Sequence, residues 1–334
     1  MEIGKVSESV LKRSILTQIK TKREEILIGA GVGEDCAILA LADNEVFVLS
    51  TDPITGTTKD IGRLAVLITT NDLASAGAEP IGLMLSVLLP EETEEADLKK
   101  MMQEIEETCD SLHIQIIGGH TEVTRAVNQP IVTVTGVGKA KRDSYVTTKG
   151  AHPGQDIVVS KWIGLEGTSI IAKEKEEELL TKYPQHLIQT AQEFDKLLSI
   201  VPEAATAVKS GVSAMHDVTE GGIYGALWEI AESSNVGLEI DLAKLPIRQE
   251  TVEVCDYFDV NPYGLISSGS LLMVTDHGYD LVRSLALEGI TAAVIGKITD
   301  SHDRVVMNGE ERRFLEPPKS DELYKIYQNR QETE

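Results

Sequence analysis

The chain has 334 residues, of which 42 % are hydrophobic and 4 % aromatic, so it is long enough for two domains with aliphatic cores. Its formal net charge of −23 argues against a nucleic acid partner, because such binding depends on basic patches. No stretch approaches the ~18 consecutive apolar residues of a membrane span. The N-terminus has no secretory pattern, so we expect a cytoplasmic protein with no membrane partner.

The cysteines and histidines do not indicate a zinc site. Cys36, Cys109 and Cys255 are far apart in the sequence, and the seven histidines are scattered. We expect the three cysteines to be reduced, buried small hydrophobic residues. An acidic chain that binds a polyphosphate therefore needs a different ion, a hard divalent cation between the two sets of negative charge.

The first half begins with a predicted helix within residues 5–28 that leads into a short apolar run at 26–28. Three glycines in five residues follow, at Gly29-Ala-Gly-Val-Gly33, and Asp35 comes two residues after Gly33. Glycines let the backbone approach a ligand closely. The spacing is not that of a Walker A loop, so this segment alone is a weak indication of phosphate binding.

A strand is predicted at 46–51 with Asp52 at its end, where an aspartate can bind a ligand or form an ordinary turn. The stretch 59–80 predicts one helix that Asp60 caps and that Gly77 and Pro80 end. Asp72 falls where the apolar stripe of this helix should continue. A buried carboxylate is costly unless it is paired, so Asp72 indicates either a metal ligand or a cap for a neighbouring loop.

The rest of this half predicts strands at 81–89, 114–117 and 131–137, and an amphipathic helix around 98–112. The strand at 114–117 runs into Gly118-Gly-His-Thr-Glu122, which we expect to be a ligand-binding loop at the end of the strand. Four acidic residues thus lie beside glycines or at element ends. Together they suggest a Mg²⁺ site, because Mg²⁺ prefers oxygen ligands and bridges to phosphates: Asp35, Asp52, Asp72 and Glu122.

A glycine- and proline-containing stretch at 146–154 marks the expected domain boundary, which gives domains at 1–150 and 151–334. In the second domain we expect a strand at 157–160, a loop at 164–167 and a helix from Thr168. The segment 213–222 predicts a strand, a turn and a helix, and its Asp217 either caps that helix or acts on a ligand. Residues 265–274 predict a strand interrupted by Gly269.

The chain resembles the aminoimidazole ribonucleotide synthase (AIR synthase) superfamily over nearly its whole length. The superfamily also includes thiamine-monophosphate kinase, selenophosphate synthetase and the hydrogenase-maturation factor HypE. Its motifs occur here in the same order, and the Asn-Asp-Leu-Ala stretch is the most specific of them. They are Gly33-Glu-Asp-Cys-Ala, Thr51-Asp52, Asn71-Asp72-Leu-Ala-Ser-Ala-Gly-Ala-Glu-Pro80, Gly118-Gly-His-Thr-Glu and Asp217-Val-Thr-Glu-Gly-Gly222.

This resemblance implies an α/β fold of two PurM-like domains, an N-terminal domain whose sheet pairs with a second subunit in a homodimer, and ATP bound with Mg²⁺ between the domains. The residues that it implies for the metal are Asp35, Asp52, Asp72 and Glu122. Those that it implies for the nucleotide are Gly33, Asp35, Asp52, Asp72, Gly118, Gly119 and Thr121. Asp217 and Glu220 would face the reacting end of the acceptor.

The second domain looks closest to the hydrogenase-maturation branch, which uses ATP to dehydrate a carbamoyl group on a C-terminal cysteine. Here the sequence ends in Asn329-Arg-Gln-Glu-Thr-Glu334 and the last cysteine is Cys255. His120 stands where relatives carry an acid, and a neutral imidazole is a poor Mg²⁺ ligand, for which Glu122 could substitute. The glycine-rich segment also lacks the reactive Cys and Lys of a selenophosphate synthetase.

The leading hypothesis is therefore an ATP-dependent enzyme that activates a small or protein-borne acceptor by phosphoryl transfer, a reaction that requires mainly positioning and charge neutralisation. Two alternatives remain. One is a non-catalytic nucleotide-binding or assembly protein, which the missing terminal cysteine favours. The other is a small-molecule kinase similar to thiamine-monophosphate kinase.

Overall fold

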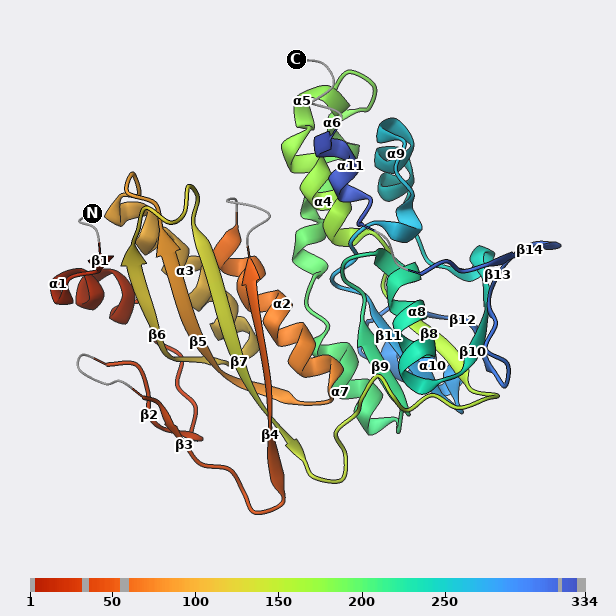
Figure 1. Ribbon diagram of the computed structural model, residues 1–334, viewed down its shortest axis with the longest axis horizontal. Coiled ribbons are helices and arrows are strands. Elements are labelled where there is room, and N and C mark those ends of the chain that lie inside the picture. The colour runs from red at the N-terminus through yellow and green to blue at the C-terminus, as the bar shows by residue number, and fades with distance from the viewer. Residues whose placement is uncertain (1–3, 32–35, 55–59, 318–319, 329–334) are drawn as a thin grey trace. The chain divides into compact units, whose positions relative to one another are not determined.

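The computed structural model describes residues 4–31, 36–54, 60–317 and 320–328 (Figure 1). The chain folds as two compact units. The N-terminal unit comprises Met1–Ala74 and Ala78–Tyr145, and the C-terminal unit comprises Ser75–Gly77 and Val146–Glu334. Among the described residues, every helix is too short or too polar to cross a lipid bilayer.

A five-stranded sheet forms the N-terminal unit, in the order β1-β6-β5-β7-β4. Its pairs are antiparallel except β5 with β6. The strands are β1 (Gly4–Lys5), β4 (Glu45–Ile54), β5 (Glu79–Leu89), β6 (Gln115–Val123) and β7 (Ile131–Lys141), and a separate pair is formed by β2 (Ile26–Ile28) and β3 (Ile38–Leu39). The helices are α1 (Glu8–Val10), the π-helical segment η1 (Leu11–Leu16), α2 (Ile61–Ser75) and α3 (Glu95–Leu112).

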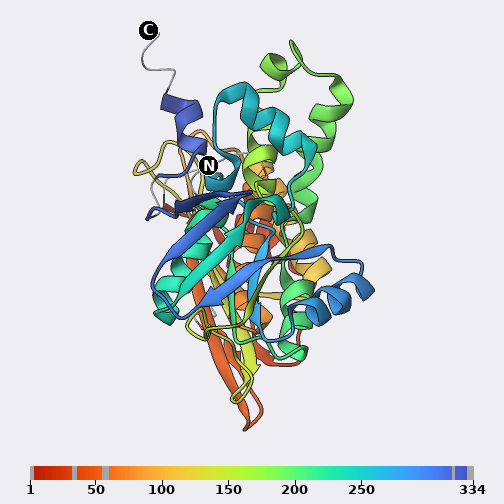
Figure 2. The ribbon, with the colours of Figure 1, turned by 90° about the vertical axis from the view of Figure 1, so that its right-hand side faces the viewer.

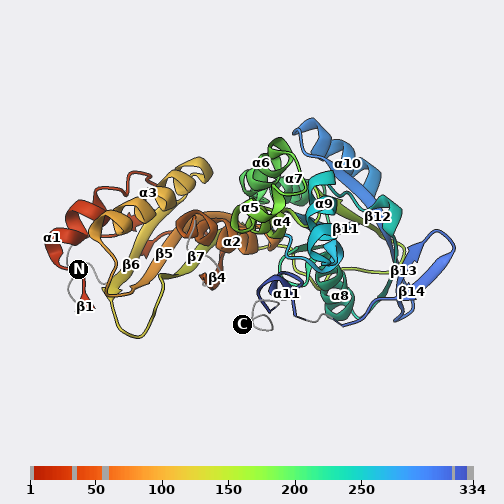
Figure 3. The ribbon, with the colours of Figure 1, turned by 90° about the horizontal axis from the view of Figure 1, so that it is seen from above.

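The helices α2 and α3 cover one face of this sheet (Figure 3). The core between them contains Leu83, Val87 and Ile105, all fully buried. The opposite face is open over much of its area and carries exposed apolar side chains, of which Leu49 is 66 % exposed and Phe47 50 %. Near one end of the open face, the β2–β3 pair packs against a small buried cluster that includes Ile81, Ile117 and Val137.

The predicted central helix is confirmed as α2, although it is shorter than expected. It ends at Ser75, and Gly77 follows with a positive φ of 74°. The amide of Ala78 donates to the Leu73 carbonyl at 3.0 Å, which closes the helix end. Pro80 does not stop the helix as expected, because it already lies within β5.

The helix expected within residues 5–28 is wrong over most of its length, because helical structure ends at Leu16. Glu106 on α3 provides the reason. Its Oε1 accepts hydrogen bonds from the amides of Lys20 and Thr21 at 2.8 and 2.6 Å. These amides are therefore satisfied by a side chain rather than by helical carbonyl groups.

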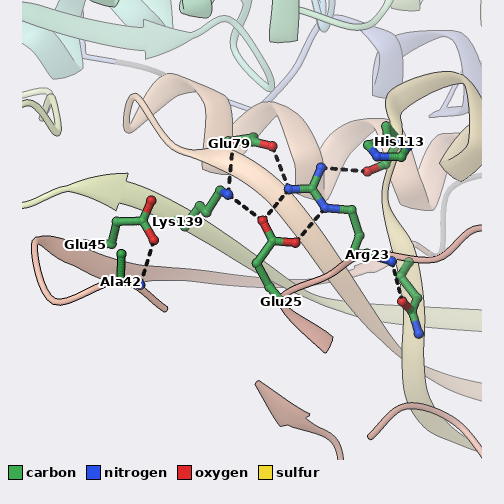
Figure 4. Close-up of polar contacts among 8 residues, drawn as sticks. Arg23, Glu25, Ala42, Glu45, Glu79, His113 and Lys139 are labelled. Carbon is green, nitrogen blue, oxygen red and sulfur yellow. Dashed lines mark hydrogen bonds and ion pairs between the residues drawn. The ribbon is translucent and has the colours of Figure 1, made fainter. Parts of the chain in front are cut away.

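A network of ion pairs fixes the segment before β2 to the sheet (Figure 4). Arg23 and Glu25 form a two-pronged pair, with Nε to Oε2 at 3.0 Å and Nη2 to Oε1 at 2.7 Å. Arg23 also reaches Glu79 at 2.6 Å, and Lys139 of β7 donates to Glu25. The side chains of Arg23 and Glu25 are only 8 % exposed, so this network is screened from water far more than a surface ion pair.

The C-terminal unit contains a seven-stranded sheet in the order β14-β13-β10-β12-β8-β11-β9. Helix α8 lies on one side of the sheet and α10 on the other (Figure 3), and Figure 2 views this unit from the side of the β13–β14 hairpin (blue). The strands are β8 (Asp156–Ser160), β9 (Ala214–Asp217), β10 (Gly237–Asp241), β11 (Leu271–Thr275), β12 (Ala292–Thr299), β13 (Arg304–Asn308) and β14 (Glu311–Phe314). The helices are α4 (Leu165–Glu174), α5 (Glu176–Leu179), α6 (Gln185–Gln192), η2 (Glu193–Leu197), α7 (Val201–Lys209), α8 (Gly222–Ser234), η3 (Leu242–Lys244), α9 (Gln249–Phe258), η4 (Pro262–Gly264), α10 (Gly278–Leu287) and α11 (Leu323–Gln328).

Three local predictions in the chain are corrected. Helix α4 begins at Leu165 rather than Thr168, which brings Glu166 into its first turn. Residues 265–270 form a loop instead of the first half of a strand, and Gly269 has a φ of 104°. Cys36 is exposed, whereas Cys109 and Cys255 are buried as expected.

Candidate functional site

Two of the predicted acidic residues meet at one serine in the N-terminal unit. The hydroxyl of Ser50 donates to Asp72 Oδ2 at 2.5 Å and lies 3.3 Å from Asp52 Oδ2. Ser50 and Asp52 are two residues apart on β4, so they project to the same face, the one on which α2 presents Asp72. The hydrogen bond from Ser50 explains why an aspartate can stand at position 72, where the apolar face of α2 would otherwise continue.

This pair has the donor chemistry that a magnesium ion requires. Both carboxylates are half-buried, and all three side chains offer oxygen atoms. Mg²⁺ typically takes one or two carboxylates and completes its octahedron with water and phosphate oxygens. Among the described residues, no group of three or more His, Cys, Asp or Glu side chains is placed to hold a metal ion.

The glycines of the second motif lie inside a strand, so the expected loop at 118–122 is wrong. Gly118, Gly119 and Thr121 belong to β6, which continues to Val123. Gly119 has a φ of 147°, and a Cβ atom there would lie 2.1 Å from the Leu85 carbonyl oxygen. Glycine is needed at this position because the neighbouring strand approaches too closely for any side chain.

A cavity of about 110 Å³ borders Gly118, Gly119 and Thr121 on the helix side of the N-terminal unit. Leu11, Ile15 and Met102 contribute its apolar wall. It is smaller than the ~300 Å³ at which small-molecule sites begin, so this cavity alone does not enclose a nucleotide.

The structure does not bring Glu122 to Asp52 and Asp72 within one chain, contrary to the predicted four-acid metal site. Strands β7 and β5 lie between β4 and β6. Strands are ~4.8 Å apart, so Asp52 and Glu122 are separated by about 14 Å or more. Glu122 instead contacts His120, with Oε2 3.1 Å from Nε2. Gly33 and Asp35 lie outside the described residues, so their predicted roles stay predictions.

In the C-terminal unit, Asp217 is the last residue of β9 and is only 6 % exposed. Its Oδ2 atom is buried and has no hydrogen-bond partner among the described residues. Within the described part of the chain no side chain caps the start of α8, so the alternative in which Asp217 caps that helix is not what the structure shows. An acceptor atom left unsatisfied in a buried position is costly, which makes Asp217 a candidate for contact with a ligand.

His216 links Asp217 to helix α8. Its Nδ1 lies 3.6 Å from Asp217 Oδ1, and its Nε2 lies 2.6 Å from Glu229 Oε2. Burial lowers the pKa of the imidazole, but the bonds to Asp217 and Glu229 outweigh burial and raise the pKa of His216 to about 9. We therefore describe His216 as a cation that holds the negative charge of Asp217 in place.

Glu220, the second predicted acceptor residue, lies in the turn before α8 and is exposed. Its Oε1 accepts a hydrogen bond from the hydroxyl of Tyr324 at 2.7 Å, and this bond raises the pKa of Tyr324 to about 12. The next residue, Gly221, donates its amide to Asp321 Oδ2 at 2.7 Å. The turn with Glu220 is thus bound to the segment that includes α11.

Sequence reasoning missed two residues beside these groups. Ser50 could have been found, because it precedes Asp52 by two residues on a predicted strand and so shares its face. Glu166, buried in the first turn of α4, gave no usable signal because the helix was expected to begin after it.

The pKa of His216 gives a test of this arrangement. Replacing Glu229 with glutamine removes one of the two carboxylates and should bring the His216 pKa down from about 9 toward its ordinary 6.5, as followed by NMR titration of the imidazole. Stability due to this raised pKa is complete below about pH 6.5 and is lost as the pH rises through about 9. Glu232→Gln, on the same helix but paired with Arg304, should leave the titration unchanged. An unchanged midpoint in Glu229→Gln would contradict the assignment.

The two units match two models of one protein family. Residues 33–140 match the N-terminal domain of AIR synthase related proteins, and residues 152–308 match the C-terminal domain. A putative hydrogenase expression/formation protein from Methanocaldococcus jannaschii is 30 % identical over 334 residues, an alignment that covers 97 % of each chain.

Two further comparisons agree. The enzyme carbamoyl dehydratase HypE from Rhodobacter capsulatus is 28 % identical over 282 residues, which are 83 % of this chain and 80 % of that protein. A crystal structure of the hydrogenase maturation protein HypE in complex with ATP superposes with a TM-score of 0.80, at 21 % identity and with 97 % of both chains covered. The chain therefore belongs to the family of AIR synthase related proteins, with a two-domain fold that it shares with HypE.

Proposed function

We propose that this protein is a Mg²⁺-dependent enzyme that uses ATP to activate the oxygen of a carbamoyl or similar carboxamide group, in the manner of the hydrogenase-maturation proteins that it resembles. The observation that carries the proposal is the Asp52–Ser50–Asp72 arrangement, two carboxylates that converge on one hydroxyl. The relatives called carbamoyl dehydratase and the relative crystallised with ATP support this choice of substrate and nucleotide.

In the proposed reaction the amide oxygen attacks the γ-phosphorus of ATP, and ADP leaves. The phosphorylated amide then loses inorganic phosphate while its N–H protons pass to a base, so the carboxamide becomes a nitrile. The amide oxygen leaves in the phosphate, and the equation balances without an added water molecule. Phosphoryl transfer of this kind depends chiefly on positioning and on neutralising charge.

The proposed division of roles follows the chemistry of the side chains. Asp52 and Asp72, with Asp35, hold Mg²⁺ against the phosphates. Gly118, Gly119 and Thr121 of β6 place backbone groups close to the nucleotide. The backbone of Gly33 is proposed to do the same. Glu122 is left out of this metal set because of its distance from Asp52. Asp217 and Glu220 act on the acceptor, where the unsatisfied Asp217 Oδ2 can accept an amide N–H.

The test is to incubate the purified protein with MgATP and S-carbamoylated cysteinyl peptides or simple carboxamides, and to follow ADP and the mass of the acceptor. The proposal predicts ADP formed in step with the loss of one water from the acceptor. Gain of a phosphoryl group would instead indicate a small-molecule kinase. Binding of ATP without turnover of any acceptor would indicate a non-catalytic nucleotide-binding protein.

We also propose that the open sheet face of the N-terminal unit pairs with a second copy in a homodimer. Leu49 and Phe47 are exposed there on β4, Met84 is 40 % exposed on β5, and Leu27 is 63 % exposed on the adjacent β2. Exposed apolar side chains on one face of a sheet are typical of an interaction surface.

Replacing Leu49 with aspartate should convert the dimer to a monomer, because it places a charge within an apolar interface. Light scattering after size-exclusion chromatography measures the mass. Leu287→Asp, a control at an apolar side chain that is 88 % exposed in the C-terminal unit, should leave the mass unchanged. A wild-type protein that is monomeric at micromolar concentration would contradict the proposal.

A further inference from the structure

Glu166 is a buried carboxyl group for which the proposed reaction has no role. It lies in the first turn of α4 and is 4 % exposed. Its Oε2 atom is buried without a hydrogen-bond partner among the described residues. A group in this state is under-satisfied whether or not it carries its proton, and such groups in folded proteins call for an explanation.

The partner of Glu166 is the loop 265–270, which we call the serine loop. Ser268 lies beside the Glu166 carboxyl group and, through its side chain and its backbone, favours the charged form of that group. The loop is buried at this point, since Ser267, Ser268 and Ser270 are all at most 2 % exposed. The Ile266 carbonyl of the same loop accepts a hydrogen bond from the Gly167 amide at 3.0 Å, and the Ser267 hydroxyl accepts one from the Gly164 amide, so hydrogen bonds join the start of α4 to the loop.

The serine loop in turn holds the segment with Asp217. The carbonyl of Ser270 accepts a hydrogen bond from the Val218 amide at 3.0 Å, directly after Asp217. The turn with Glu220 packs against the same region, because a Cβ atom on Gly222 would lie 2.7 Å from the Leu265 carbonyl oxygen. A displacement of the serine loop would therefore move both proposed acceptor residues.

A second buried carboxyl group, that of Asp321 in the C-terminal segment, lies beside the serine loop. Asp321 is 4 % exposed and accepts hydrogen bonds from the Gly221 and Leu323 amides, and the backbone of Ile266 in the serine loop lies close enough to act on its pKa. The charged groups that act on Glu166 are Asp321 and Glu220, both acidic, and Tyr324 is bound to Glu220. A negative charge on the buried Glu166 would therefore be repelled by two other acids, the buried Asp321 and the exposed Glu220.

We propose that Glu166 is a positioning residue whose protonated carboxyl group keeps the serine loop closed against the segment that presents Asp217 and Glu220. When Glu166 loses its proton, the closed arrangement is disfavoured and the loop opens so that water reaches the carboxylate. The effect on catalysis rests on the proposed function, but the effect on the loop does not.

The difference between the pKa of Glu166 in the closed loop and in the open loop sets how strongly loop opening depends on pH. Burial raises the pKa of Glu166 from 4.5 to about 7 in the closed state, against the opposing effect of the Ser268 bonds and with the help of Asp321 and Glu220. In an open state that hydrates Glu166 the pKa returns to its ordinary value. The equilibrium constant for opening should then rise about tenfold between pH 6 and pH 8.

Hydrogen exchange followed by mass spectrometry on the full chain measures this opening, after correction for the intrinsic pH dependence of exchange. The wild type should lose protection about tenfold across this pH range in peptides that span 264–271 and 217–222. Glu166→Gln, which cannot ionise, should show no pH dependence. The matched control is Glu106→Gln in the N-terminal unit, at a carboxyl group that is 6 % exposed and also has an unpartnered Oε2. It should keep the wild-type response.

Two further measurements keep the proposal testable if Glu166→Gln folds poorly. Ser268→Ala removes a hydrogen bond that favours the charged carboxylate, so the midpoint of the pH response should move upward. With an acceptor that is turned over, Glu166→Gln should flatten the pH profile of kcat/KM and leave the Kd of MgATP unchanged. A pH-independent loop in the wild type, or an unchanged response in Glu166→Gln, would overturn the proposal even if no acceptor is found.

Discussion

Replacing Asp72 with asparagine is expected to weaken Mg²⁺-dependent binding of ATP by about 100-fold, while the protein stays folded. The substitution keeps the size of the side chain and removes one of the two negative charges that converge on Ser50. The acidic chain would then meet the triphosphate with a weakly bound cation. Isothermal titration with ATP at fixed Mg²⁺ measures the loss.

Two companion variants show whether the loss belongs to the carboxylate pair. Ser50→Ala should cost about tenfold, because it removes the hydroxyl that orients both acids but leaves their charges. Asp143→Asn, at an exposed aspartate in a turn of the same unit, should bind as the wild type does. Equal affinity in Asp72→Asn and wild type would exclude Asp72 from the metal site.

Replacing Glu25 with alanine is expected to destabilise the protein by about 3 kcal/mol, one of the largest losses for a single ion-pair residue in this chain. Glu25 is paired with Arg23 and Lys139 and has a side chain only 8 % exposed. Its removal leaves two cations close together with a single remaining carboxylate, Glu79, which is 53 % exposed. Urea unfolding, monitored by circular dichroism, gives the change in free energy.

The control for this variant is Glu91→Ala, which breaks the exposed pair with Arg125 and should cost no more than about 1 kcal/mol. The pH dependence gives a second check. The hydrogen bond from Arg23 is the largest cause that lowers the pKa of Glu25 to about 2. The stabilisation is therefore complete above about pH 4.5 and is lost as the pH falls through about 2. If Glu25→Ala and Glu91→Ala lowered the free energy of unfolding by similar amounts at neutral pH, the network around Glu25 would not stabilise the protein as proposed.

Much of the fold could be predicted because hydrophobic spacing follows secondary structure closely in this chain. The run 81–89 became β5, and the apolar positions of residues 98–112 became the buried face of α3. The turn that joins β13 to β14 has the sequence Asn308-Gly309, which is typical of a β-hairpin, so this connection also follows from the sequence.

The errors occur where a residue serves tertiary contact rather than local structure. Gly118 and Gly119 were interpreted as a loop because glycine is common in loops. Here Gly119 permits the backbone of β6 to approach Leu85. In the same way, the serine loop was expected to be part of a strand, but the hydroxyls of its Ser267 and Ser270 bond to the segment before α4.

The candidate site could be predicted only as a list of acids. The sequence places Asp52 at the end of a predicted strand and Asp72 on a predicted helix. In the structure Asp52 lies inside β4, which continues to Ile54, and both acids approach one hydroxyl. Strand order is not visible in the sequence, so it could not show that two strands separate Glu122 from Asp52. The buried state of Glu166 depends on the packing of three segments that are far apart along the chain.

The central claim is that the N-terminal unit binds ATP through a divalent cation, and one titration tests it most directly. Calorimetry with ATP in the presence of Mg²⁺, repeated with EDTA, should give saturable binding that disappears when the cation is removed. Binding of equal strength in EDTA, or no binding at millimolar MgATP, would contradict the claim.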